Sequence, residues 1–137
     1  MKDRYLFKAK RFDNGEWVEG YLSYPFCTKK GNESYYFYAK DSLGFFCRCV
    51  VYASTICQCA GRKDKNGNLI WENDIARTIF NGIEHIYRVI WDESELDFKA
   101  TNGKEFYKSN FEYLSCCDEV EIIGNVFDNP ELLEREE

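Results

Sequence analysis

Alternating apolar and polar residues run through most of this sequence and give its first structural signal. In IEHIYRVIW, residues 83–91, the side chains of Tyr87 and Trp91 lie on one face of an extended chain. Glu84 and Arg88 lie on the other face, and such an alternation is typical of a partly buried β-strand. Three further segments show the same character: EVEIIGNVF, SYYFYA and FFCRCVVY. The pattern predicts about eight to ten strands.

Asn-Gly pairs occur four times, each between segments that show the strand pattern. Asn-Gly readily adopts the positive φ angles of a type I′ turn, whose twist matches that of paired strands. Each pair is therefore predicted to connect two strands of a β-hairpin. The four pairs are Asn14-Gly15, Asn66-Gly67, Asn81-Gly82 and Asn102-Gly103.

Signals for helices are few. In SNFEYL, Ser109 is a candidate N-cap with a glutamate three residues later, which is the spacing of a capping box. In NPELLEREE, Asn129 precedes Pro130, and proline is favoured at the first helical position. The sequence thus predicts one or two short helices, near residues 109–114 and 129–135.

Length and composition fit an all-β protein. The chain has 137 residues, which suits one domain or two small lobes that share a core. Aromatic residues make up 18% of it, and broad rings pack well on a pleated sheet. We therefore expect an all-β fold with one or two short helices, forming a single domain over residues 1–137. A cysteine-rich strand gives way to a charged turn near residues 60–66, which separates an N-terminal lobe, about 1–62, from a C-terminal lobe, about 66–137.

Charge and hydropathy narrow the range of partners. The formal net charge is −6, and an acidic chain is repelled by nucleic-acid phosphates unless its basic residues gather on one face. Nucleic acid is therefore disfavoured but kept as an alternative. No segment approaches the roughly 20 apolar residues of a membrane helix, and the charged N-terminus is unlike a signal peptide. We expect a cytoplasmic protein that does not enter membranes, whose seven cysteines are thiols packed as small apolar residues.

Two motifs in the middle of the chain resemble reactive sites but favour turns. GRKDKNG, residues 61–67, has the wrong glycine spacing for a phosphate-binding loop, so a hairpin tip is predicted. In WENDIA, Glu72 and Asp74 point the same way on an extended chain, as the paired carboxylates of an acid–base or cation site do. The favoured interpretation is that Asn73 and Asp74 turn the chain into the next strand.

Two Cys-x-Cys pairs raise the alternative of a zinc site. A hairpin centred on Ala53 would set Cys47 opposite Cys59. It would also set Cys49 opposite Cys57, so that four thiols share one patch, as a zinc site requires. Structural zinc pairs mostly have two or more intervening residues, however. The favoured interpretation is apolar packing, with no metal and no cofactor.

Residues suited to catalysis are scarce. His85 is the one histidine, so any nucleophile with a histidine base must use it. It lies mid-strand among apolar residues, and we expect a packed histidine. We therefore predict no catalytic residues and no enzymatic activity. Basic clusters adjoin the turns, and a nucleic-acid face that stacks bases on Tyr35, Tyr36 and Tyr38 is kept as an alternative.

Three segments, in order along the chain, resemble the YopX proteins, a family found in phages and prophages. FKAKRFDNGEWVEGYL is similar to the family's opening, TICQCAGRKDKNGNLIWENDIA to its central signature, and EVEIIGNVFDNPELL to its close. Cys57, Cys59 and Asn73 depart from the signature, and Asn73 replaces a glycine whose turn geometry asparagine also tolerates. The resemblance implies a mostly β fold of compact lobes, with a small SH3-like barrel in the C-terminal half. It implies no established activity and supplies no catalytic residues.

The sequence as a whole predicts a non-catalytic interaction protein of phage or prophage origin in the cytoplasm of the bacterial host. A protein partner or self-association is favoured, because an acidic surface with a surplus of aromatic rings suits such contacts. The candidate contact residues are Trp17, Trp71 and Asp74. The first alternative is a nucleic-acid accessory protein. The second is a zinc-binding protein, whose four ligands would be Cys47, Cys49, Cys57 and Cys59.

Overall fold

The computed structural model describes residues 5–40, 43–93, 96–101 and 111–134. The chain forms two compact units, Met1–Cys59 and Ala60–Glu137, hereafter the N-terminal and C-terminal units. The division falls within one strand, β5 (Cys57–Lys63). This strand pairs with β1 (Phe7–Lys10) at its start and is the neighbour of β6 (Leu69–Trp71) in the C-terminal unit. The single domain expected over residues 1–137 stays a prediction.

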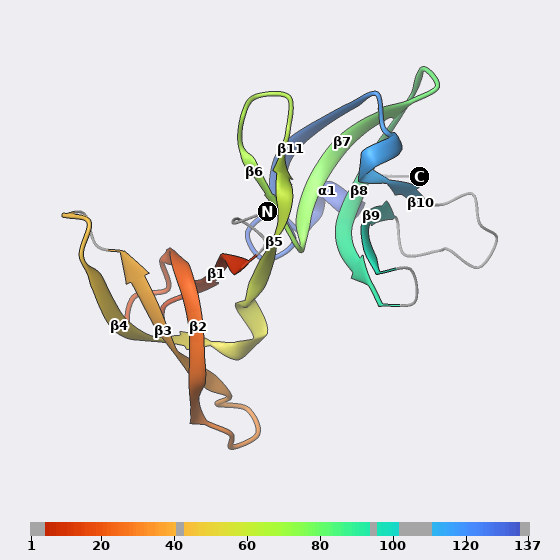
Figure 1. Cartoon of the computed structure of the whole chain (residues 1–137). Helices are drawn as coiled ribbons and strands as arrows, with labels where there is room; N and C mark the ends of the chain where they lie inside the picture. Colours follow the sequence, from red (N-terminus) through yellow and green to blue (C-terminus); the bar gives the residue numbers. More distant parts are fainter. Residues whose placement is uncertain (1–4, 41–42, 94–95, 102–110, 135–137) are drawn as a thin grey trace. The chain divides into compact units, whose positions relative to one another are not determined.

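Antiparallel strands build most of both units, so the predicted all-β class is confirmed. The described residues contain eleven strands, one more than the upper limit of the predicted number. The N-terminal unit also contains β2 (Trp17–Cys27), β3 (Ser34–Lys40), β4 (Phe46–Tyr52) and the 3₁₀ turn η2 (Ala53–Thr55). The C-terminal unit contains β7 (Asp74–Phe80), β8 (Ile83–Asp92), β9 (Asp97–Thr101), β10 (Phe111–Tyr113), the 3₁₀ turn η4 (Leu114–Cys116), β11 (Glu119–Asn125) and the helical turn α1 (Glu131–Glu134) (Figure 1).

The N-terminal unit is an antiparallel meander, in which strands adjacent in sequence are adjacent in the sheet, in the order β4-β3-β2-β1 (Figure 1). The buried core on its inward face consists of Ala9, Phe37, Ala39 and Val51. The sheet curls: Arg11 forms a bridge with Val51, and Phe12 N donates a hydrogen bond to Val50 O at 2.8 Å. β4 therefore also pairs with the segment that follows β1.

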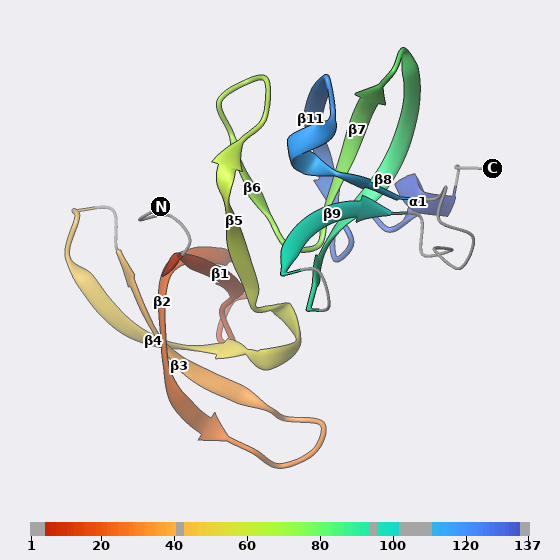
Figure 2. The ribbon, with the colours of Figure 1, turned by 45° about the vertical axis from the view of Figure 1, so that its right-hand side comes forward.

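The C-terminal unit holds a five-stranded sheet in the order β10-β9-β8-β7-β11, and Figure 2 shows β7, β8 and β9 side by side. The predicted inward face of β8 is confirmed, because Tyr87 and Val89 are buried and Trp91 packs against the same core. β10 and β11 are the two edge strands, so in the described part of the chain this sheet is open. The closed SH3-like barrel that the resemblance implied is not found, since closure requires the two edge strands to pair.

Three of the four predicted Asn-Gly turns join paired strands, and their glycines have positive φ angles. These angles are 73° at Gly15, 85° at Gly67 and 79° at Gly82. Asn81 has a φ angle of 53°, so the loop between β7 and β8 has the positive φ angles of a type I′ turn at both central residues. The fourth predicted turn, Asn102-Gly103, lies outside the described residues.

One predicted helix is present and the other is not. α1 lies within the predicted range 129–135, and Leu132 N donates a hydrogen bond to Asn129 O at 3.1 Å at its start. Of the predicted range 109–114, the first two residues lie outside the described residues, and Phe111–Tyr113 forms β10. β10 pairs with β9, so ladder hydrogen bonds to a neighbouring strand outweigh a short local helix signal.

Candidate functional site

The strand register of the N-terminal unit brings aromatic and basic side chains together on the face opposite the buried core. Tyr21 of β2 faces Tyr38 of β3, and Tyr38 faces Arg48 of β4. Facing residues of antiparallel strands point the same way, so these side chains share one surface, here termed the outer face. Its aromatic members include Trp17, Tyr21, Tyr36, Tyr38 and Phe46. Its basic members are Lys8, Lys10, Lys40 and Arg48.

Several rings of the outer face are exposed. Phe46 is 52% exposed, Tyr21 46% and Tyr38 40%. The ring centroids of Tyr21 and Phe46 are 6.0 Å apart, so exposed rings from two different strands lie next to each other. A contiguous exposed apolar surface of this kind is typical of an interaction site.

Each basic residue of the outer face lies over one of its rings. The distances from cation to ring centroid are 4.7 Å for Lys8 and 5.3 Å for Lys10 over Trp17, 5.7 Å for Lys40 over Phe46, and 4.5 Å for Arg48 over Tyr36. At these distances the electron-rich face of the ring attracts the cation, by about 0.5–1 kcal/mol at an exposed site. Positive charges and ring faces therefore alternate across the surface.

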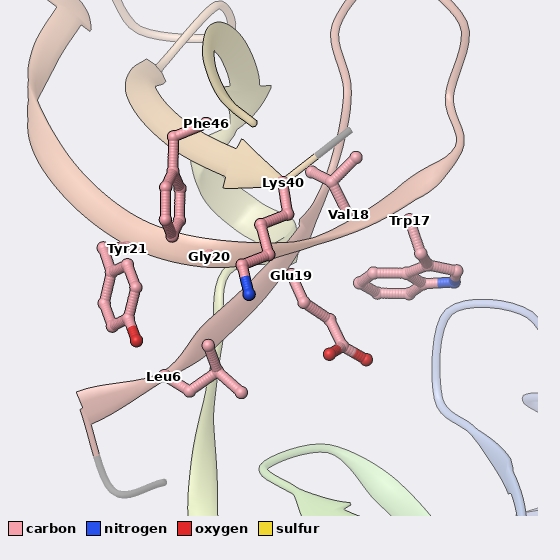
Figure 3. Close-up of a pocket in the computed structure, with 8 residues that line it drawn as sticks. All are labelled: Leu6, Trp17, Val18, Glu19, Gly20, Tyr21, Lys40 and Phe46. Atoms are coloured by element: carbon pink, nitrogen blue, oxygen red, sulfur yellow. The ribbon is translucent and has the colours of Figure 1, made fainter. Parts of the chain in front are cut away.

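A groove of about 580 Å³ opens on the outer face. Figure 3 shows Tyr21, Lys40 and Phe46 projecting into it from β2, β3 and β4, with Trp17 at one side. The rest of its lining is Leu6, Val18, Glu19 and Gly20. The volume lies within the usual range of small-ligand sites. The groove thus presents ring faces and an amino group to the same ligand.

Net charge differs between the two units. Residues 1–59 contain nine lysines and arginines and six aspartates and glutamates, which gives a net charge of +3. Residues 60–137 contain nine basic and eighteen acidic residues, which gives −9. Among the described outer-face positions of β1–β4, Glu19 is the only acid. The net charge of the whole chain therefore does not argue against an anionic ligand on the outer face.

The three predicted contact residues lie in different surroundings. Trp17 is half-buried and belongs to the outer face. Trp71 and Asp74 are buried, 5% and 2% exposed, and Trp71 N donates a hydrogen bond to Asp74 Oδ2 at 2.8 Å. Asn73, between them, has a φ angle of 74°, so the predicted turn in WENDIA is present. Two of the three candidates thus have a structural role, and Trp17 is the one that shares a surface with exposed rings.

Asp64, in the GRKDKNG motif, is a buried polar residue that the sequence analysis missed. Its Oδ1 accepts hydrogen bonds from Asn66 N at 3.0 Å and Asn68 N at 2.9 Å, and its Oδ2 accepts one from Ile122 N at 2.9 Å. Burial by itself raises the pKa of Asp64, but the amide hydrogen bonds outweigh it and hold the pKa below its ordinary value. The motif is a hairpin tip, as predicted, and its aspartate binds that tip to β11. The spacing Asp-x-Asn, typical of an Asx turn, was the available signal.

Acid is expected to weaken this hairpin through Asp64. Because the folded pKa is lowered, the stabilisation is complete above the unfolded pKa of about 3.9 and is lost as the pH falls through the folded pKa. The Asp64→Asn variant cannot titrate at this position. The Ile122 amide should therefore be better protected from hydrogen exchange in the wild type than in the variant at about pH 5, and this difference should shrink as the pH falls to about 2. A constant difference over that range would show that Asp64 does not carry the effect.

The hairpin that would gather four thiols does not form. β4 pairs with β3, so Cys47 faces Ala39, and β5 pairs with β1, so Cys57 faces Lys8. Burial raises the pKa of Cys49, which favours the neutral thiol of a packing residue. Among the described residues, no group of three or more histidine, cysteine, aspartate or glutamate side chains has the arrangement of a metal site. The pairing thus contradicts the zinc alternative, which required a hairpin of Cys47 and Cys49 against Cys57 and Cys59.

His85 has the packed surroundings expected of it. Its ring is half-buried and stacks on that of Tyr87, with centroids 4.6 Å apart and planes 8° from parallel. Across the sheet it faces Thr78, which is fully buried. The histidine therefore packs within the sheet, where β7 and β8 pair.

The fold and the outer face define a class of protein: an all-β chain with two antiparallel sheets, one of which exposes aromatic and basic side chains. The chain belongs to the YopX family, because the family model described as YopX protein matches residues 6–134. The resemblance of the three sequence segments is thereby confirmed. A search of curated proteins finds no match to the chain. In the described ranges, no helix has the length and apolar character needed to cross a membrane.

Proposed function

We propose that this chain is a non-catalytic interaction protein of phage or prophage origin, acting in the cytoplasm of its bacterial host, with the outer face as its contact surface. The observation that carries the proposal is the exposure of Tyr21, Tyr38 and Phe46 beside two exposed cations, Lys40 and Arg48. Membership of the YopX family supports the phage or prophage origin.

The outer face has the physical properties of a binding surface. Burying apolar surface of its rings against a partner gains about 25 cal/mol per Å². Aromatic side chains have few rotatable bonds, so fixing them costs little conformational entropy. Tyr21, Tyr38 and Phe46 are moreover held on paired strands, which leaves little backbone order to be gained on binding.

The residues whose side chains are suited to catalysis have structural roles instead, which supports a binding protein without catalytic activity. Asp64 and Asp74 accept hydrogen bonds from backbone amides, and His85 stacks on Tyr87. At the described strand positions, the outer face offers one carboxylate, Glu19, where acid–base catalysis by carboxylates commonly uses two. The surface supplies rings and cations, which are groups for recognition.

Affinity capture from host cells that carry the phage or prophage tests the proposal. The baits are the wild type, a Tyr21→Ala/Phe46→Ala variant, and Phe80→Ala as a matched control, since Phe80 is an aromatic residue of the C-terminal unit with 37% exposure. Protein and nucleic acid retained on each bait are measured with and without nuclease. The double variant should retain at least about tenfold less of the partner than the wild type does, as expected for the loss of interface anchors. Phe80→Ala should retain as much as the wild type.

Equal retention by the double variant, with an unchanged circular dichroism spectrum, would rule out the outer face as the contact surface. Captured protein that depends on Tyr21 and Phe46 would support the partner class favoured by the sequence. Captured nucleic acid with the same dependence would support the first alternative.

A further inference from the structure

We infer that the outer face binds single-stranded nucleic acid by base stacking and phosphate contacts, without reading sequence. This inference rests on the proposed function, because it names the ligand of the same surface. Proteins that bind single strands in this way combine a positively charged groove with aromatic side chains on which successive bases stack. The outer face contains exposed rings, and its four basic side chains, with Glu19 as the one acid at the described strand positions, give it a net positive charge.

The rings suit stacking by several bases. Tyr21, Tyr38 and Phe46 come from three successive strands of the sheet, and neighbouring strands lie about 4.8 Å apart. A flexible strand laid across the sheet therefore meets one ring after another. Tyr21 and Phe46 both line the groove, so a base that enters it meets two ring faces. Each stacked base is worth about 1–3 kcal/mol, and every base has a face that can stack.

The cations lie where a phosphate backbone would pass. Lys40 is 5.7 Å from the Phe46 ring centroid and Arg48 is 4.5 Å from that of Tyr36. A base stacked near either ring would bring its phosphate close to a positive side chain. The net charge of +3 on residues 1–59 attracts a polyanion to this unit, although the whole chain is acidic.

Other ligands would use less of this surface. A duplex hides the faces of its bases, so it would meet the cations but not the rings. A protein partner would cover the rings but would need acidic groups to match the cations. The acidic C-terminal unit of a second copy could supply such groups, so self-association is the strongest competing outcome. A single strand satisfies the rings and the cations together.

Fluorescence anisotropy of a labelled oligo(dT) of about 20 nucleotides, titrated with the purified full chain, tests the inference at two salt concentrations. If three or four phosphates are neutralised, affinity should fall about 20- to 50-fold between about 50 and 200 mM NaCl. A duplex of the same length should bind more weakly than the single strand at each salt concentration. Light scattering at the same protein concentrations reports whether the chain self-associates.

Matched substitutions separate stacking from charge. Phe46→Ala should lower the affinity about 5- to 150-fold, the equivalent of one stacked base, with the salt dependence unchanged. Lys40→Ala should reduce the slope of log affinity against log salt by about 0.7. Phe80→Ala and Lys65→Ala, which make the same changes in the C-terminal unit, should bind as the wild type does. Circular dichroism checks that each variant is folded.

Three results would overturn the inference. The first is no binding of the oligonucleotide by the wild type at about 50 mM NaCl. The second is an affinity of Phe46→Ala equal to that of the wild type, because binding would then depend on charge alone. Polyglutamate that competes as well as the oligonucleotide itself would lead to the same conclusion. The third is self-association of the chain into a dimer that does not bind the oligonucleotide. If the oligonucleotide fails while capture from host cells still depends on Tyr21 and Phe46, the proposed function stands and its partner is a protein.

Discussion

Replacing Asp92 with alanine is expected to lower the free energy of unfolding of the C-terminal unit by about 3–5 kcal/mol. Asp92 at the end of β8 and Lys99 in β9 form an ion pair, with 2.6 Å between Oδ2 and Nζ. Their side chains are only 17% and 6% exposed, so water screens the pair weakly. Removing the carboxylate leaves a buried ammonium without this counter-charge, which is the costly case.

Removing both charges distinguishes the cost of burying one charge without the other from the value of the pair. Asp92→Leu combined with Lys99→Met should lie within about 1–2 kcal/mol of the wild type, because no charge remains to be desolvated. Glu119→Ala is the control for an exposed pair: Glu119 and Lys65 are 2.8 Å apart with side chains 40% and 39% exposed, and its loss should cost about 0–1 kcal/mol.

Hydrogen exchange of the β8 and β9 amides during a urea titration measures these free energies for the C-terminal unit. If Asp92→Ala lowers the free energy of unfolding by less than about 1 kcal/mol, the pair of Asp92 and Lys99 contributes no more than an exposed ion pair does. A double variant as unstable as the single variant would show that the pair contributes through its own attraction.

Alternation along the chain predicted which side chains face a core, but not which strands pair. Tyr87 and Trp91 were expected on one face of a strand, and there Tyr87 is buried and Trp91 packs against the same core. The face of a strand is a local property with a period of two residues. The hairpin around Ala53 that the zinc alternative required is absent, because β1, about 50 residues away in sequence, pairs with β5 at Cys57. Pairing of distant segments leaves no mark in the local pattern, and the zinc alternative failed for that reason.

Turn chemistry was predicted best because it depends on a few adjacent residues. Asn73 takes the positive φ angle that a glycine would take, and Asp74 accepts a hydrogen bond from the backbone three residues earlier. Asp64 shows the limit of this approach. Its contacts with Asn66 and Asn68 follow from spacing, whereas the contact of its second oxygen with Ile122 depends on the fold.

The outer face was only partly visible in the sequence. SYYFYA carries aromatic residues on both faces of its strand, so alternation cannot distinguish core rings from surface rings. Tyr35, one of the stacking residues of the nucleic-acid alternative, packs against the core beside the fully buried Phe37. Tyr38 is exposed, and the register that brings it next to Tyr21 and Arg48 requires the strand order. The charge difference between the units likewise becomes visible only once the chain is divided at Cys59.

Gly20→Ala is expected to disrupt the N-terminal sheet, at a cost of about 3 kcal/mol or more. Gly20 lies in β2 and faces Ala39 of β3. A Cβ at Gly20 would lie 2.0 Å from Tyr38 O, 2.8 Å from Tyr38 C and 2.9 Å from Ala39 Cα. All three are backbone atoms, so no side-chain rotation can relieve the overlap. Relief requires β2 and β3 to move apart, which breaks the ladder between them.

Gly44→Ala separates this steric effect from the general cost of replacing glycine. A Cβ at Gly44 meets no atom within 4 Å but requires a φ angle of +90°, so a cost of about 1–2 kcal/mol is expected. Hydrogen exchange should therefore accelerate throughout β2 and β3 in Gly20→Ala and much less in Gly44→Ala. Tyr21 and Tyr38 lie on these two strands, so Gly20→Ala should also lose oligonucleotide binding. If hydrogen exchange in Gly20→Ala equals that of the wild type, the sheet accommodates the added methyl group and keeps the ladder between β2 and β3. The close approach of the two strands at Gly20 would then not be what holds the outer face in register.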